Sequence, residues 1–360
     1  MISLAVKYRP TKWYDVVEQD ATKSILNNQL ETGEIKNAYL FCGGAGTGKT
    51  TCARIFASEI NKGVGTPIEL DAASNNSVDD IRKLIEQAQS ASIDSEYKVF
   101  ILDEVHALSN SAWQAMLKIL EEPPKKSVFI MCTTDPQKIP NTILSRVQRY
   151  DFKRISQQGI IDRLERILKN EYQEKFEEFA GDKVVTDEQL NCITWDMESI
   201  EYIARLADGG MRDAITMLDK CLAYSDDLTI ENVSKALGTA NVSMMLDLTE
   251  YIVVQDIKNI VQIINRVHSE GKDLKLFIRQ YTEFILDILK FDLLGDFKYT
   301  KLPDIKSVRE VLEDENEEFF NICADLLDEL IKLGVAIKWD SSPKSVIEAT
   351  LIMFSRRNNK

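Results

Sequence analysis

The sequence has no long apolar run, and its cysteines are few and scattered. No stretch of the 360 residues approaches the roughly 20 apolar residues that a membrane-spanning helix needs, and the first nine residues are too short and too mixed for a signal peptide. Both absences point to the cytosol, where thiols stay reduced. The six cysteines form no C-x-x-C pair, so we predict that no zinc is bound. Cys42 and Cys132 lie in apolar runs and are expected in the core.

An excess of basic residues is also missing. The net charge is −14, with 44 Lys and Arg against 58 Asp and Glu. Residues 1–150 are near neutral, with 17 basic and 18 acidic side chains, so the rest of the chain carries most of the net charge. Such a chain can contact nucleic acid only through a few local cations. The composition is that of a soluble globular protein, and the length allows two or three domains.

What is present first of all is a glycine-rich stretch: Gly43, Gly44, Ala45, Gly46, Thr47, Gly48, Lys49, Thr50 and Thr51. It follows the apolar run 38–42, a predicted strand, and opens the predicted helix 51–61. A strand, G-x-x-x-x-G-K-T and a helix in this order indicate a phosphate-binding loop rather than a chance turn. The glycines let backbone N–H groups surround an anion, and the helix N-terminus adds positive charge. Lys49 is expected at the β- and γ-phosphates, and the Thr50 hydroxyl at Mg²⁺.

Strands alternate with helices over the first 152 residues, which predicts a doubly wound α/β domain with a parallel sheet. Residues 6–10 are expected to be extended, and Asp20 is expected to be the N-cap of the first helix. The further predicted strands are 68–70, 99–102, 128–132 and 150–152, and the further predicted helices are 20–31, 77–88 and 112–122. Ligands of such sheets bind beyond the carboxyl ends of the strands.

After Ser156 no further strands are expected. Residues 156–237 are predicted to be helical apart from a polar, mixed segment over 172–194, and residues 240–360 are predicted to be helical as well, for example over 273–294 and 319–333. There is no internal repeat and no low-complexity tail. The chain therefore divides into three expected domains: 1–155, 156–238 and 239–360.

Carboxylates close the third predicted strand. Asp103 is expected to hold Mg²⁺ through water, and Glu104 is expected to orient and activate the attacking water. Together with the phosphate loop, these two roles would complete the site of a nucleoside triphosphatase. The alternative is that Asp103 and Glu104 are an ordinary acidic pair on the surface. The phosphate loop about 50 residues upstream makes the functional interpretation the better one. Thr134 ends the next strand and could bond the γ-phosphate or the water, or simply begin a turn. Arg146 and Arg212 are candidate charge stabilisers, although spacing alone favours ordinary surface arginines.

Read together, these motifs resemble those of the AAA+ clamp-loader ATPases, most closely the gamma/tau subunits of bacterial DNA polymerase III. The likeness is dense over residues 5–155 and returns at 203–240. The residues that carry it are 7–10 (KYRP), 43–50, 69–76 (ELDAASNN), 102–109 (LDEVHALS), 117–124 (LKILEEPP), 133–140 (TTDPQKIP) and 143–146 (ILSR).

The resemblance implies a nucleotide-binding domain, a helical lid and an all-helical collar that drives oligomerisation. It implies that Thr134 is sensor 1, that Arg146 is an arginine finger acting on ATP of the neighbouring subunit, and that Arg212 is sensor 2. Arg9 and Pro10, with Val16 and Val17, would line the adenine pocket. Five subunits would open a sliding clamp with ATP and Mg²⁺ and place it on primer–template DNA.

Contacts with DNA are expected from the starts of the helices that follow the second and third strands, because helix N-termini and a few cations can track phosphates. The candidate residues there are Ser74, Asn75, Asn76, Arg82, Ser109 and Asn110.

Three departures from the family pattern leave the ATPase motifs intact. The residues 61–65 stand where the bacterial subunit has a four-cysteine zinc module, Val147 replaces the cysteine of Ser-Arg-Cys, and residues 172–194 resemble an insertion in the lid. The chain also stops at 360, without the long tail of tau. We therefore expect a divergent member of the family. It is either encoded by a bacterium, or encoded by a phage and located in the cytoplasm of its host. Another AAA+ DNA motor (branch migration or helicase loading) and an inactive scaffold subunit remain as alternatives.

Overall fold

The computed structural model describes residues 2–90, 95–180, 193–237, 241–271, 273–303, 306–314, 316–340 and 342–357. It divides into two compact units. The first comprises Met1–Glu174 with Ala207–Asp219, and the second comprises Lys175–Leu206 with Lys220–Lys360.

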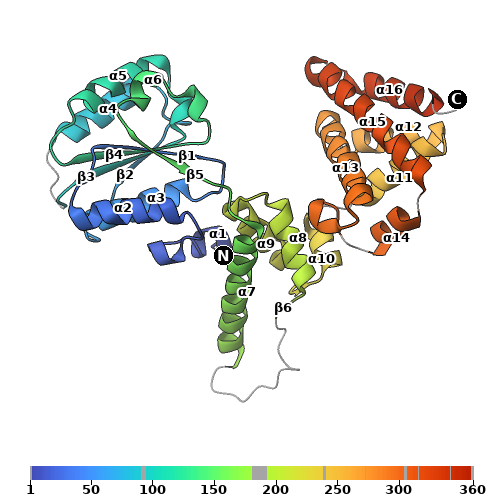
Figure 1. Cartoon of the computed structure of the whole chain (residues 1–360), viewed down its shortest axis with the longest axis horizontal. Coiled ribbons are helices and arrows are strands. Elements are labelled where there is room, and N and C mark those ends of the chain that lie inside the picture. Colours follow the sequence, from blue (N-terminus) through green and yellow to red (C-terminus); the bar gives the residue numbers. More distant parts are fainter. Residues whose placement is uncertain are drawn as a thin grey trace. The chain divides into compact units, whose positions relative to one another are not determined.

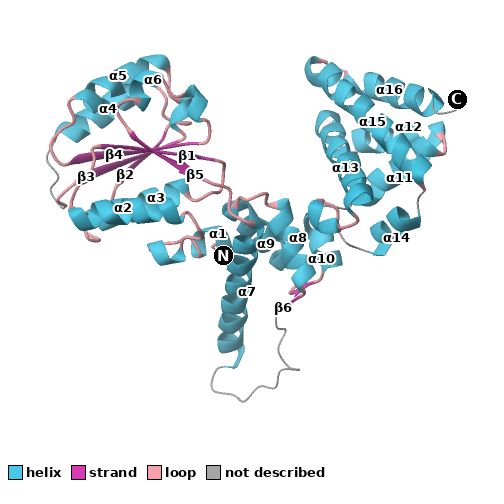
Figure 2. Cartoon of the chain, viewed as in Figure 1, coloured by secondary structure: helices cyan, strands magenta, loops and turns pink. Residues whose placement is uncertain are grey.

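A five-stranded parallel sheet forms the centre of the first unit, with the order β2-β3-β4-β1-β5. The sheet is covered by helices on both faces (Figures 1 and 2). Its strands are β1 (Ala38–Gly43), β2 (Ile68–Asp71), β3 (Lys98–Asp103), β4 (Ser127–Thr133) and β5 (Gln148–Phe152). The doubly wound fold predicted from the alternation of strands and helices is confirmed.

Side chains alternate between two apolar layers along each central strand, as burial on both faces requires. In β3, Phe100 and Leu102 pack toward α4 (Val78–Gln89) and α5 (Asn110–Glu121), whereas Val99 and Ile101 pack toward α2 (Asp20–Thr32) and α3 (Lys49–Ile60). Cys42 and Cys132 are buried in these layers, as expected. Burial raises the pKa of the Cys42 thiol to about 11.

The remaining helices of the first unit are α1 (Leu4–Lys7), α6 (Asn141–Leu144), α7 (Gln157–Ala180) as far as residue 174, and the start of α9 (Met211–Tyr224). The short helix α1 corrects the expectation that residues 6–10 are extended, because Val6 and Lys7 are helical. Asp20 is the first residue of α2 and not its N-cap, since Gln19 takes the cap position in a left-handed conformation with φ 57°.

The second unit is mostly helical. Its helices are the end of α7, α8 (Met197–Leu206), the end of α9, α10 (Ile230–Leu237), α11 (Asn241–Val253), α12 (Ile257–Ser269), α13 (Leu274–Leu294), α14 (Lys306–Asp314), α15 (Glu317–Ala336) and α16 (Pro343–Arg357). An apolar core of residues from α11 to α16 holds its C-terminal part together, and Tyr281, Phe319 and Cys323 are almost completely buried there.

Two predictions for this region were wrong in detail. Strands do occur after Ser156: β6 (Thr194–Trp195) and β7 (Asp227–Leu228) pair in parallel, too short to leave a periodic pattern in the sequence. Residues 172–180 continue α7 instead of interrupting the helices. The rest of the predicted lid insertion, residues 181–192, lies outside the described residues. In the described part of the chain, no helix has the length and apolar character needed to cross a bilayer.

Candidate active site

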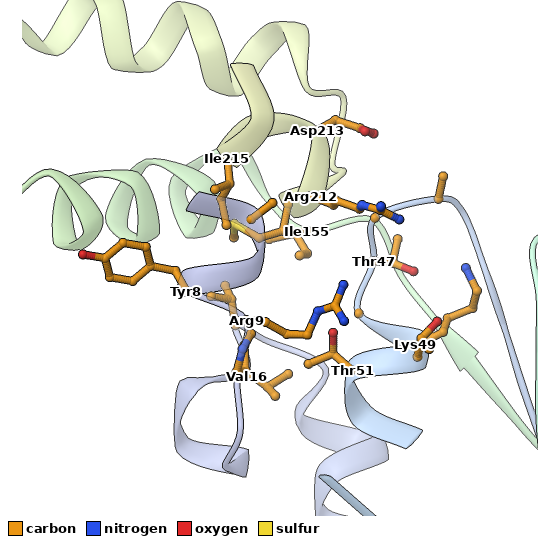
Figure 3. A pocket seen from close by; sticks show the side chains of 18 of the residues that line it. Tyr8, Arg9, Val16, Thr47, Lys49, Thr51, Ile155, Arg212, Asp213 and Ile215 are labelled. Carbon is orange, nitrogen blue, oxygen red and sulfur yellow. The ribbon is translucent and has the colours of Figure 1, made fainter. Parts of the chain in front are cut away.

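A cavity of about 430 Å³ opens beyond the carboxyl ends of β1 and β3, within the first unit (Figure 3). This is the edge where ligands of parallel α/β sheets bind. The side chains around it form an apolar wall (Val16, Val17, Ile155, Met211 and Ile215), the phosphate loop and a set of charged groups. Its lining residues include Tyr8, Arg9, Pro10, Val16, Val17, Ala45, Gly46, Thr47, Gly48, Lys49, Thr50, Thr51, Arg54, Asp103, Glu104, Ile155, Arg163, Met211, Arg212 and Ile215.

The phosphate loop turns from β1 directly into α3. Gly48 precedes the helix with φ 98°, a left-handed conformation that glycine adopts without strain. Gly46 faces Gly210 so closely that a Cβ would lie 3.0 Å from the Gly210 Cα atom, and its carbonyl accepts a 3.0 Å bond from the Met211 N–H. The loop is thus packed against the segment that begins α9, which brings Arg212 to the cavity.

Lys49 is 6% exposed, although it carries a charge. Its ammonium donates to the carbonyl oxygens of Gly43 at 2.9 Å and Gly44 at 2.7 Å. Burial lowers its pKa, and the negative charges of Glu104 and Asp103 act in the opposite direction. A buried cation whose acceptors are the neutral carbonyls of Gly43 and Gly44 favours an anionic ligand at this position.

Asp103 and Thr50 meet at the ends of β3 and the phosphate loop. The Thr50 hydroxyl donates to Asp103 Oδ2 at 2.8 Å, and the Glu104 N–H donates to Asp103 Oδ1 at 3.0 Å. A hydroxyl and a carboxylate are hard oxygen ligands of the kind that Mg²⁺ prefers, so the two residues fit the predicted magnesium site.

Glu104 stands just past the end of β3 with φ 47°, a conformation uncommon for a residue with a side chain. Its Oε2 atom accepts hydrogen bonds from the Thr134 hydroxyl at 2.9 Å and the Thr134 N–H at 3.3 Å. His106 Nδ1 lies 3.2 Å from the same oxygen and 3.2 Å from the Thr133 hydroxyl. The structure therefore joins Glu104 to Thr134, two residues that sequence reasoning had singled out separately.

Sequence reasoning missed three residues here: His106, Arg54 and Arg163. Arg54 lines the cavity from α3 and pairs with Glu69 on β2 through two bonds of 2.8 and 2.7 Å. Arg163 on α7 donates to the Tyr8 carbonyl at 2.9 Å. Its position in the second turn of α7 carries no local signal in the sequence, so only the tertiary structure could find it.

Arg146 lies outside the residues that line the cavity. Its guanidinium bonds to the Glu121 carboxylate at 2.7 Å and to the Thr142 carbonyl at 2.6 Å. It is therefore not placed beside the phosphate loop of its own chain.

The candidate DNA contacts also lie outside this cavity, at the starts of α4 and α5. Ser77 caps α4 through a capping box with Asp80, and Ser109 caps α5. The Ser109 N–H donates to the Asn76 carbonyl at 3.2 Å, which joins the two loops. Arg82 pairs on the surface with Asp79 at 3.1 Å.

Comparisons with known proteins agree with these features. Three family models match successive parts of the chain: "DNA polymerase III, delta subunit" over residues 66–156, "DNA polymerase III clamp loader subunit, ATPase lid domain" over 180–227, and "DNA polymerase III subunits gamma and tau domain III" over 228–314. Among solved structures, the Thermotoga maritima RuvB Holliday junction branch migration motor matches with a TM-score of 0.51 and 16% identity, over 74% of this chain and 86% of that chain. At this identity the match shows the AAA+ fold alone.

Curated relatives match over most of the chain. The DNA polymerase III tau subunit of Bacillus subtilis is 33% identical over 98% of this chain, which spans 63% of that subunit's length. The tau subunit of Escherichia coli is 35% identical over 74% of this chain, which spans 42% of that subunit's length. The chain thus spans less than two thirds of these longer relatives. The DNA polymerase III gamma subunit of Buchnera aphidicola is 30% identical, with 78% of both chains covered. The chain therefore belongs to the family of DNA polymerase III gamma and tau subunits.

Proposed function

We propose that this protein is an ATPase subunit of a clamp loader, which uses ATP to open a sliding clamp and place it on primer–template DNA. The observation that carries the proposal is the joint placement of Lys49, the Thr50–Asp103 pair and the Glu104–Thr134 pair at one edge of the sheet. Family membership supports the same assignment.

In this proposal, each polar group has one task. Lys49 and the loop N–H groups bind the β- and γ-phosphates, and Thr50 and Asp103 hold Mg²⁺, which neutralises phosphate charge. Glu104 orients the attacking water and accepts its proton, and Thr134 positions Glu104 or the γ-phosphate. Arg212, aimed at the cavity from α9, stabilises the charge that develops on the transferred group (Figure 3).

The proposed assembly has five subunits in the cytoplasm, in which Arg146 completes the site of a neighbour. Within each subunit, residues 1–155 would bind nucleotide, residues 156–238 would form the lid, and residues 239–360 would form the collar. The placement of Arg146 away from its own cavity supports a role toward another chain.

The test compares ATP hydrolysis by the chain, with its partner loader subunits, in the presence and absence of a sliding clamp and primed DNA. The proposal expects the two together to stimulate hydrolysis. Basal hydrolysis without any stimulation would favour another AAA+ DNA motor, and a chain that binds no ATP would favour an inactive scaffold. The arrangement of Lys49, Thr50, Asp103 and Glu104 argues against the scaffold.

Arg82→Ala should lower DNA-stimulated hydrolysis several-fold and leave basal hydrolysis unchanged. The residue lies near the start of α4, where it forms a surface ion pair with the exposed Asp79, so its loss should cost little stability. Lys118→Ala, a surface cation near the end of α5, is a matched control. Unchanged DNA stimulation in the Arg82 variant would remove this residue from the DNA-binding surface.

We also expect the purified protein to contain no stoichiometric zinc. Structural zinc sites use four protein ligands, mostly Cys and His, and residues 61–65 contain neither. Elemental analysis of the full chain measures this directly. One zinc per chain would show that ligands distant in the sequence form a site.

A further inference from the structure

Four arginines of the described chain line the cavity, and they differ in whether the protein supplies acceptors for their guanidinium groups. Arg54 and Arg163 have acceptors within the protein, the Glu69 carboxylate and the Tyr8 carbonyl. For the guanidinium groups of Arg9 and Arg212, no hydrogen bond or ion pair is found within the residues that the structure describes. Arginine keeps its charge in proteins, so these two groups remain as donors without protein acceptors in a pocket built for an anion.

Arg9 is held in place through its backbone. The Tyr8 carbonyl accepts from Arg163 at 2.9 Å, the Arg9 N–H donates to the Val6 carbonyl at 3.3 Å, and the Leu4 N–H donates to Asp219 Oδ2 at 3.1 Å. From this anchored segment the Arg9 side chain extends across the pocket, away from Tyr8 and Val16 and toward the loop and helix that carry Thr47 and Thr51 (Figure 3). Its charged end therefore lies between the apolar wall and the phosphate loop.

The electrostatic surroundings of Arg9 favour a further anion. Burial lowers its pKa, and the positive charges of Arg54 and Arg212 lower it further. Glu69 and Asp103 act in the opposite direction, but each already accepts a hydrogen bond, Glu69 from Arg54 and Asp103 from Thr50.

We propose that the Arg9 guanidinium binds the α-phosphate of the nucleotide, and does not merely line the adenine subsite as the family resemblance implied. Lys49 lies on the other side of the pocket from Arg9 and is assigned to the β- and γ-phosphates (Figure 3). The α-phosphate is the phosphate nearest the ribose and the apolar wall, and Arg9 is the cation placed to bind it. A guanidinium fork matches two phosphate oxygens. A phosphate placed there also relieves the repulsion between Arg9 and Arg212.

This inference rests on the proposed nucleotide site, and the test measures ADP and ATP affinities of the full chain carrying Arg9→Gln. Both affinities should fall by about 10- to 100-fold, which corresponds to one charge-assisted hydrogen bond, and by the same factor, since both ligands carry the α-phosphate. The affinity of adenosine should not change, and it is calculated from displacement of a fluorescent nucleotide whose own affinity is measured separately for each variant. Arg149→Gln, which removes an exposed arginine paired with Asp151 on β5, is the matched control and should bind like wild type.

The outcomes separate the possible roles of Arg9. A loss for ATP alone would place the guanidinium at the γ-phosphate, and an equal loss for adenosine would place it at the base; either result overturns the proposal. If wild type binds both nucleotides and Arg9→Gln binds them equally well, only the role of Arg9 fails. A wild-type chain that binds neither nucleotide overturns the proposed function and the role of Arg9 together.

Melting temperatures distinguish ligand binding from a structural role. Because Arg9 faces other cations, Arg9→Gln without nucleotide should melt at or above the temperature of wild type, whereas the rise caused by ADP should be smaller. A variant that melts lower without nucleotide, but gains as much from ADP as wild type does, would show that Arg9 supports the fold and would overturn the proposal.

Discussion

Lys49→Ala is expected to remove nearly all ATP hydrolysis and to weaken ATP binding. The buried ammonium at the Gly43 and Gly44 carbonyls is the cation built into the loop, and no other side chain of the G-x-x-x-x-G-K-T run carries charge. Loss of one preorganised charge at a phosphoryl group costs roughly 10²- to 10³-fold in rate or more. Phosphate release at saturating ATP and equilibrium binding together measure both effects.

Glu104→Gln completes this test, because it should separate binding from chemistry. Glutamine preserves the size of the side chain and still accepts the bonds from Thr134, but it cannot take a proton from water. The variant should bind ATP as wild type does and fail to hydrolyse it. Lys36→Ala, an exposed lysine before β1, serves as the control for both variants. Hydrolysis by Glu104→Gln at the wild-type rate would show that another group activates the water.

Arg146→Ala is expected to bind ATP with near-normal affinity and to lose roughly 10³-fold or more in hydrolysis, the scale of a missing arginine finger. The Arg146 side chain lies outside the cavity of its own chain, so the substitution leaves the phosphate loop and the magnesium ligands of that chain unchanged. The Arg146–Glu121 pair is partly exposed and contributes little to stability. Glu121→Gln breaks the same pair but keeps the arginine, and should hydrolyse ATP normally.

Mixing two inactive chains tests whether Arg146 acts on a neighbour. An Arg146→Ala chain keeps an intact nucleotide site, and a Lys49→Ala chain keeps an intact arginine. Co-assembled with the other loader subunits, they should recover part of the hydrolysis that neither shows alone. Mass measurement must first establish that the mixed complex forms. A stable mixed assembly without recovered activity would contradict the trans-acting role.

The contiguous motifs could be predicted from sequence because each one encodes its own local geometry. Glycines between an apolar run and a helix specify the phosphate loop, and Asp103 at the end of β3 must lie at the ligand edge of a parallel sheet. Helix starts were less certain, because they depend on competing caps. Gln19 occupies the N-cap position of α2 in a left-handed conformation and without a side-chain capping bond, although Asp20 is the better capping residue by type.

By itself, the sequence determined the phosphate loop, the α/β class of the first unit and the helical nature of most of the second, since these follow from short-range patterns of apolar and special residues. Only the tertiary structure decided which distant side chains meet. Parallel pairing of β3 with β4 brings Thr134 to Glu104, and the packing of Gly46 against Gly210 carries Arg212 to the cavity. The direction of Arg9 follows from its anchored backbone. These contacts join residues separated by 30 positions (Glu104 and Thr134) to 164 positions (Gly46 and Gly210), so no local periodicity records them.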